Sequence, residues 1–176
     1  MRALMALTGH EIDRDIAAAA ARVLDPERDQ IVAVHVVHPR EVQSTVNTGR
    51  LAVMDISLAS SVRAKGQRPE PSFVEDSGQA VQRLEAEMRD HIEELKQDFL
   101  SDFSVEFDVI IEKDPADAIV EAAEQRAAGR IVMGTRGKRS RFSSALLGSC
   151  AADVVRRTNA PVLIVKEGTV AGVTAP

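Results

Sequence analysis

The chain has 176 residues, of which 44% are hydrophobic and 28% charged, and its formal net charge is −5. This composition is typical of a globular domain and excludes a disordered or fibrous chain. No apolar run approaches the roughly 18–20 residues that span a bilayer, and residues 1–7 are too short for the apolar stretch of a signal peptide. We therefore expect a cytoplasmic protein that does not associate with membranes.

The cysteine, histidine and aromatic content excludes further classes. The single cysteine, Cys150, allows neither an internal disulfide nor a multi-cysteine metal site, which agrees with a reducing cytoplasm. The four histidines show no metal-ligand spacing, and the only aromatic residues are five Phe. With few rings for base stacking and a negative net charge, we expect no nucleic-acid partner.

The N-terminal part predicts a strand, a helix and a second strand. Residues 2–7 are a short apolar run that ends at Thr8-Gly9, as expected of a buried strand. From Glu11 onwards, the apolar residues fall on one helical face, and the helix ends before Pro26. Residues 31–37 are apolar on both faces, which indicates a strand covered on both sides in a parallel sheet.

Residues 40–77 show no clean period. The segment contains Pro69, Pro71 and a polar, basic patch over residues 63–68, and residues 51–62 predict a short helix. A segment of this length inside a compact domain is usually functional or mobile. We interpret it as an insertion and as a candidate surface for a protein partner.

Regular structure returns at Gly78. Apolar residues spaced 3, 4, 4, 3 and 4 apart predict a long amphipathic helix, namely Val81, Leu84, Met88, Ile92, Leu95 and Phe99. Residues 105–111 predict a strand. Asp114-Pro115 then fits the N-cap and first position of a helix that ends with Gly129 as its C′ glycine.

The C-terminal part repeats the alternation. Residues 131–133 predict a buried strand, residues 146–155 a helix, residues 161–165 a last strand, and residues 168–176 a frayed tail. Strands that alternate with helices, and that are apolar on both faces, predict a doubly wound α/β sheet. We expect one domain over residues 1–167.

The loop after residues 131–133 carries the strongest ligand signal. Ligands bind at the carboxyl ends of the strands in open α/β sheets. Four of the six residues over 136–141 are cationic, Gly134 and Gly137 allow close backbone approach, and Gly148-Ser149 lies near a helix N-terminus. A phosphate-bearing ligand is the direct inference, and a solvated basic turn is the alternative.

Several segments together resemble the universal stress protein family. They are residues 131–137, Leu147-Gly148-Ser149, Val154-Val155, residues 160–165, residues 33–37 and residues 114–119. The resemblance spans the domain apart from residues 40–77. It implies a single-domain, five-stranded parallel sheet of the Rossmann-like, adenine nucleotide alpha hydrolase-like type, with strand order 3-2-1-4-5.

The resemblance also implies a nucleotide site. In ATP-binding members the loop reads Gly, two residues, Gly, nine residues, Gly and then Ser or Thr. The resemblance places phosphates on this loop and adenosine between the ends of the first and second strands. The implied nucleotide-binding residues are Leu7, Thr8, Val36, Met133, Gly134, Arg136, Gly137, Lys138, Gly148, Ser149 and Cys150. The implied cofactors are ATP with Mg²⁺, or AMP, and none is obligatory.

The sequence departs from the family pattern at three points. Thr8 stands where ATP-binding members usually have an Asp, Lys113 stands where a Gly usually precedes Asp-Pro, and ten residues rather than nine separate Gly137 from Gly148. A threonine hydroxyl forms hydrogen bonds but brings no charge.

The other titratable residues predict structural roles. His35 lies within an apolar strand and is interpreted as a packed core residue, whereas His10 follows the first strand and is a weaker candidate for ligand contact. His91 has Asp90, Glu93 and Glu94 beside it in the sequence, which predicts a solvated position. Cys150 suits small-residue packing better than a role as a reactive thiol.

The resemblance implies a stress-response protein that binds an adenine nucleotide as a regulatory ligand and is not an enzyme, with weak ATP hydrolysis left open. One alternative is a nucleotide-independent dimeric adaptor, and a third is an enzyme of adenylyl or phosphoryl transfer. Residues 161–165 are apolar and would form a sheet edge, which favours a homodimer through the last strand.

Overall fold

The computed structural model of the chain describes residues 1–40, 42, 77–135 and 148–168. Its elements in chain order are β1 (Arg2–Leu7), α1 (Ile12–Val23), β2 (Gln30–Val37), α3 (Ser77–Phe99), β3 (Val105–Ile111), α4 (Pro115–Gln125), β4 (Ala128–Thr135), α5 (Ser149–Arg157) and β5 (Val162–Lys166). The helix expected over residues 51–62, the basic patch over residues 63–68 and the tail after Gly168 lie outside the described residues.

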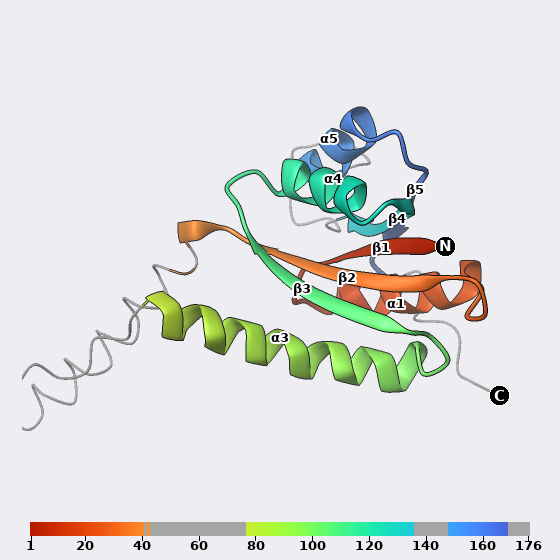
Figure 1. The fold of residues 1–176 in the computed structure, drawn as a ribbon, viewed down its shortest axis with the longest axis horizontal. Coiled ribbons are helices and arrows are strands. Elements are labelled where there is room, and N and C mark those ends of the chain that lie inside the picture. The colour runs from red at the N-terminus through yellow and green to blue at the C-terminus, as the bar shows by residue number, and fades with distance from the viewer. Residues whose placement is uncertain (41, 43–76, 136–147, 169–176) are drawn as a thin grey trace, which may run out of the picture.

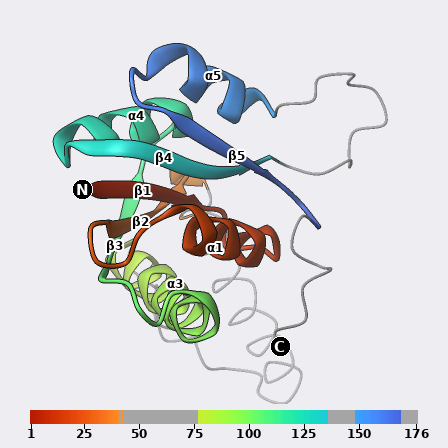
Figure 2. The same ribbon diagram turned by 90° about the vertical axis from the view of Figure 1, so that its right-hand side faces the viewer.

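The described strands form one parallel sheet in the order β3-β2-β1-β4-β5, which confirms the predicted fold. α1 and α3 cover one face of this sheet, and α4 and α5 cover the other (Figure 1). The turned view shows the sheet between its two helical layers (Figure 2). β1 is the central strand, since Leu4 pairs with Val32 of β2 on one side and with Ile131 of β4 on the other.

β1 contributes to two separate cores. Successive side chains of a strand point to opposite faces, so an apolar residue is needed at every position when both faces are covered. Ala3, Met5 and Leu7 pack in the core with α1 and α3, whereas Leu4 and Ala6 pack in the core with α4 and α5. This double coverage explains the continuous apolar run that the sequence shows over residues 2–7.

α3 packs along the face that α1 also covers. Its buried residues Met88, Ile92 and Leu95 recur at spacings of four and three, as the sequence pattern predicted. The guanidinium of Arg14 on α1 lies 5.1 Å from the ring centroid of Phe99 and 2.8 Å from Asp98. The two helices are therefore joined by polar contacts at the surface as well as by the apolar core beneath.

The junction between α4 and β4 differs from the sequence expectation. α4 ends at Gln125, and Gly129 already lies within β4, so Gly129 is not the C′ glycine of the helix. The left-handed backbone position is Ala127, with φ 51°, and its N–H donates to the carbonyl of Glu124 at 3.0 Å. A non-glycine residue there costs about 1–2 kcal/mol.

Two C-terminal boundaries also differ from those expected. α5 begins at Ser149 rather than at residue 146, because Gly148 has extended backbone (φ −61°, ψ 155°) and serves as the N-cap. The last strand begins at Val162 rather than at Pro161, which has no N–H to donate. The Pro161 carbonyl still accepts a hydrogen bond from Ile131 N at 2.9 Å.

Among the described helices, none combines the length and apolar character needed to cross a bilayer.

Candidate functional site

Five of the predicted site residues meet at the carboxyl edge of the sheet. Leu7 ends β1, Thr8 follows it, and Val36 lies next to His35, the residue of β2 that pairs with Leu7. Met133 of β4 pairs with Ala6 of β1, and Gly134 comes directly after it. Because parallel strands end at the same edge, these five residues lie in one row along that edge. Arg136, Gly137 and Lys138 lie outside the described residues.

The side chains of Leu7 and Met133 are packed in opposite cores, 5% and 4% exposed, respectively. These two residues could therefore offer a ligand only backbone atoms. Val36 is half-buried against the core that α4 and α5 cover. The polar side chain that the row contributes is that of Thr8, which is half-buried at the strand end.

Gly134 is small because α1 lies against it. A Cβ at this position would lie 2.7 Å from Ile12 Cδ1 and 3.0 Å from Ile16 Cδ1. Real Cβ atoms do not approach other carbons this closely, so a larger residue would displace the helix side chains. The structure thus gives Gly134 a packing role, and its contact with a ligand stays a prediction.

A buried carboxylate organises the end of β1. Asp13, in the first turn of α1, is fully buried and accepts hydrogen bonds from Thr8 N at 2.9 Å, Thr8 Oγ1 at 3.0 Å and Gly9 N at 2.7 Å. Gly9 adopts the left-handed region with φ 76°, which favours glycine. Asp13 is not among the site residues predicted from the sequence. The carboxylate that Thr8 lacks, compared with the usual Asp, is supplied here by Asp13 in the first turn of α1.

Two histidines belong to the same region. His91 Nε2 lies 3.1 Å from Asp13 Oδ2, so His91 faces a buried carboxylate and the prediction of a solvated position is wrong. His35 Nδ1 lies 3.2 Å from the carbonyl oxygen of Leu7, to which it donates. The carboxyl end of β1 is therefore held from α1, from α3 and from β2. His10 is exposed beside it.

The N-terminus of α5 supplies the other half of the candidate site. The helix connects two parallel strands, so it begins at the carboxyl edge of the sheet. Gly148 makes no side-chain cap, and the first N–H groups of a helix attract anions. Ser149 is exposed, whereas Cys150 is half-buried, as expected of a packing residue.

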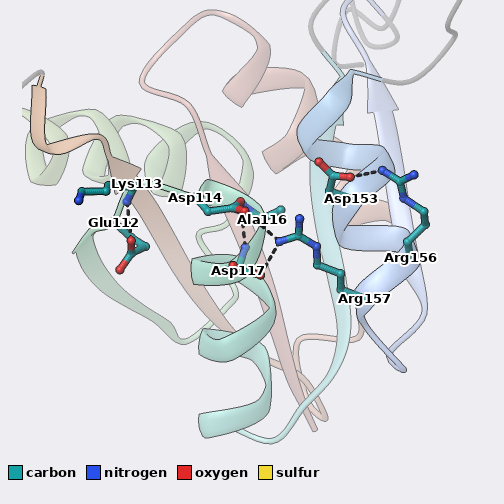
Figure 3. Close-up of polar contacts among 8 residues, drawn as sticks. All are labelled: Glu112, Lys113, Asp114, Ala116, Asp117, Asp153, Arg156 and Arg157. Atoms are coloured by element: carbon teal, nitrogen blue, oxygen red, sulfur yellow. Dashed lines mark hydrogen bonds and ion pairs between the residues drawn. The ribbon is translucent and has the colours of Figure 1, made fainter.

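Asp114 caps α4 and joins it to α5 (Figure 3). Its carboxylate accepts from Ala116 N at 2.9 Å and Asp117 N at 3.3 Å, and Pro115 occupies the first helical position, which confirms the predicted N-cap. Arg157 of α5 donates to Asp114 at 3.0 Å and also to Asp117. Lys113 is exposed, and its backbone N–H donates to Glu112 Oε1 at 2.6 Å.

These contacts shift two pKa values. The hydrogen bond from Arg157 is the main cause that holds the pKa of Asp114 below its ordinary value of 3.8, and the N–H groups of Asp117 and Ala116 act in the same direction against desolvation. The hydrogen bonds to Asp114 and Asp117 in turn raise the pKa of the Arg157 guanidinium.

The lowered pKa of Asp114 predicts an acid-dependent stability. A carboxylate with a lowered folded-state pKa stabilises the fold above pH 3.8, and this contribution is lost as the pH falls through the folded-state value. Asp114→Asn keeps an N-cap but removes the charge. We expect the variant to be less stable than the unmodified chain in urea titrations at about pH 6, and the difference to shrink below about pH 4. A pH-independent difference would contradict this.

Two surface hollows among the described residues border α4. One, of about 420 Å³, is lined by Glu112, Asp117, Val120, Glu121 and Glu124. The other, of about 370 Å³, lies between the end of α4 and the turn before β5. Within the described part of the chain, no three His, Cys, Asp or Glu residues gather as a metal site.

Comparisons with known proteins agree on one family. The model of the universal stress protein family matches residues 1–166. Universal stress protein MJ0577 of Methanocaldococcus jannaschii is 30% identical over 141 residues, covering 78% of this chain and 77% of the relative. The solved structure of MJ0577 gives a TM-score of 0.64 at 21% identity and covers 94% of both chains.

Two further solved structures with the same fold contain nucleotides. A universal stress protein in complex with cAMP gives a TM-score of 0.58 at 18% identity, covering 94% of this chain and 96% of the other. The universal stress protein from Archaeoglobus fulgidus in complex with dAMP gives 0.53 at 17% identity, covering 94% and 98%. At these identities the likeness shows the fold that the chains share.

Proposed function

The chain belongs to the universal stress protein family, and on that premise we propose that it is a regulatory stress-response protein that binds an adenine nucleotide. The observation that carries the proposal is the reversal of strand order at β1. The chain proceeds from β1 to β2 and β3 on one side, and β4 and β5 lie on the other. Such a reversal opens a crevice at the carboxyl edge, where open α/β sheets bind ligands.

Phosphate binding is assigned to the β4 side of this crevice. The uncapped N-terminus of α5 at Gly148 attracts anions, and residues 136–141 add four cations in the sequence before it. The nucleoside is assigned to the ends of β1 and β2, beside Thr8 and Val36. Two relatives of the same fold hold cAMP and dAMP, which makes AMP the first ligand to test and ATP with Mg²⁺ the second.

The test begins with native mass spectrometry of the purified chain, followed by calorimetry with AMP and with ATP and Mg²⁺. Arg136→Ala and Lys138→Ala should each weaken binding about tenfold and flatten its salt dependence, because both act by charge. Arg156→Ala is the matched control, since Arg156 pairs with Asp153 in the last turn of α5. A chain that binds neither nucleotide would refute the proposal.

We assign no catalytic role to the polar residues of the site. In a nucleophilic triad the hydroxyl is hydrogen-bonded to the imidazole, so that the ring can take the hydroxyl proton. Here Thr8 Oγ1 and His91 Nε2 both bond Asp13 instead. These contacts favour ligand binding over acyl transfer by a triad. The cytoplasmic location expected from the composition is part of the same proposal.

We further propose a homodimer that forms through β5, an edge strand in the described sheet. Ile131 N donates to the Pro161 carbonyl, and alternate residues of a strand bond the same neighbour in a parallel pair. The N–H of Leu163 therefore faces β4, and the N–H of Ile164 faces the free edge. A second β5 could pair with that edge about a two-fold axis.

The two positions give a matched test of the dimer. Ile164→Pro removes an edge-facing N–H and should give a folded monomer of 19.0 kDa by light scattering, where the unmodified chain gives twice that mass. Leu163→Pro removes a hydrogen bond to β4 and should destabilise the fold itself. An unmodified chain that is monomeric at micromolar concentration would refute this proposal.

A further inference from the structure

The carboxylate of Asp13 is saturated with donors. Thr8 N and Thr8 Oγ1 lie 2.9 and 3.0 Å from Oδ1, and Gly9 N and His91 Nε2 lie 2.7 and 3.1 Å from Oδ2. The two backbone groups can only donate, and four groups on two oxygens fill the lone pairs of a carboxylate. Asp13 is therefore an acceptor toward every neighbour, and the Thr8 hydroxyl hydrogen points at it.

This bonding fixes what the end of β1 can offer a ligand. A hydroxyl has one hydrogen and two lone pairs, so a hydroxyl whose hydrogen is taken presents only lone pairs. The N–H groups of Thr8 and Gly9 are also taken by Asp13. A phosphate oxygen, itself an acceptor, would find no donor on these two residues and would lie close to a buried negative charge.

We propose that Asp13 determines ligand specificity by making the Thr8 hydroxyl an obligate acceptor. The ligand group that lies at the end of β1 is then a hydrogen-bond donor, either a ribose hydroxyl or an amino group of the base. The inference rests on the proposed function and deepens it, because it names the chemistry that one strand end selects. His91 is a positioning residue that holds Asp13 Oδ2 from α3.

The test measures affinities for AMP, 2′-deoxy-AMP, 3′-deoxy-AMP and IMP, which lacks the amino group. One of the three analogues should bind the unmodified chain about tenfold more weakly than AMP, because it lacks the group that donates a hydrogen bond to the Thr8 hydroxyl. Thr8→Val removes the hydroxyl but keeps both N–H bonds to Asp13. This variant should bind AMP about tenfold more weakly and should no longer distinguish AMP from that analogue. Thr8→Ser should restore the preference.

Asp13→Ala tests the polarity itself. The substitution removes the acceptor of the Thr8 hydroxyl, which frees the hydroxyl hydrogen for the ligand. The preference for AMP over the discriminating analogue should then fall to less than about threefold. If this variant does not fold, Thr8→Val decides alone.

The outcomes separate this inference from the proposed function. The inference is overturned if Thr8→Val weakens the binding of all four nucleotides equally, or if it does not weaken the binding of AMP. In either case, AMP binding by the unmodified chain still upholds the proposed function. An unmodified chain that binds none of the four nucleotides overturns both.

Discussion

Replacing Asp13 by alanine should lower the free energy of unfolding by about 2–4 kcal/mol. The substitution leaves the N–H groups of Thr8 and Gly9, the Thr8 hydroxyl and His91 without their shared acceptor. Hydrogen bonds to a charged group contribute about 1.5–3 kcal/mol each. The sum is reduced because Thr8 is half-buried and Gly9 exposed, so water replaces part of what is lost.

Urea titration followed by circular dichroism measures this loss, and Glu11→Ala is the matched control. Glu11 is an exposed acidic residue at the same end of α1, without a side-chain capping bond. Its removal should change stability by less than about 0.5 kcal/mol. Hydrogen exchange should also become faster at the amides of Thr8 and Gly9 in Asp13→Ala alone. A loss of less than about 1 kcal/mol would contradict the role assigned to Asp13.

Gly134→Val should lower the free energy of unfolding by about 2–3 kcal/mol, because the new side chain enters space that Ile12 and Ile16 occupy. A glycine kept small only for a ligand would allow this substitution at little cost to stability. Thermal and urea unfolding of the apo chain distinguish the two explanations directly.

A double variant provides the control for Gly134. Ile12→Ala removes one of the side chains against which the new residue would collide. Gly134→Val combined with Ile12→Ala should therefore lose at least about 1 kcal/mol less than the sum of the single variants. Strict additivity would mean that the glycine and Ile12 do not share the space that the structure gives them.

The sheet was predictable because strand patterns and the family resemblance agreed. The continuous apolar runs in β1 and β2 indicated strands covered on both faces, and the spacing from Val81 to Phe99 gave α3. The strand order came from the resemblance, since each strand pattern alone is compatible with several orders. The boundary at Gly129 was wrong because Ala127 takes the left-handed position that normally favours glycine.

The polar half of the site was not predicted because the acidic neighbours of His91 in the sequence do not share its face of the helix. His91 has acidic residues beside it, but it lies three residues after Met88 and four before Leu95, on the buried stripe of α3. Asp13 likewise falls between Ala17 and Ala20 when α1 is drawn with 3.6 residues per turn, and both alanines are fully buried. The sequence signal for this polar cluster was therefore the position of Asp13 and of His91, each on the buried face of its helix.

The central position of β1 also governs the order in which the sheet can form. The pairing of β1 with β2 joins residues close in the sequence, such as Leu4 and Val32, with only α1 between the strands. The pairing of β1 with β4 joins residues far apart in the sequence, such as Leu4 and Ile131. Contacts between residues far apart in the sequence tend to form late, because closing a longer stretch of chain costs more conformational entropy before the new contacts offset it. A chain in which only β1, α1 and β2 had formed would expose the side of β1 that pairs with β4 in the complete sheet. That side is the place where misassembly between chains would begin.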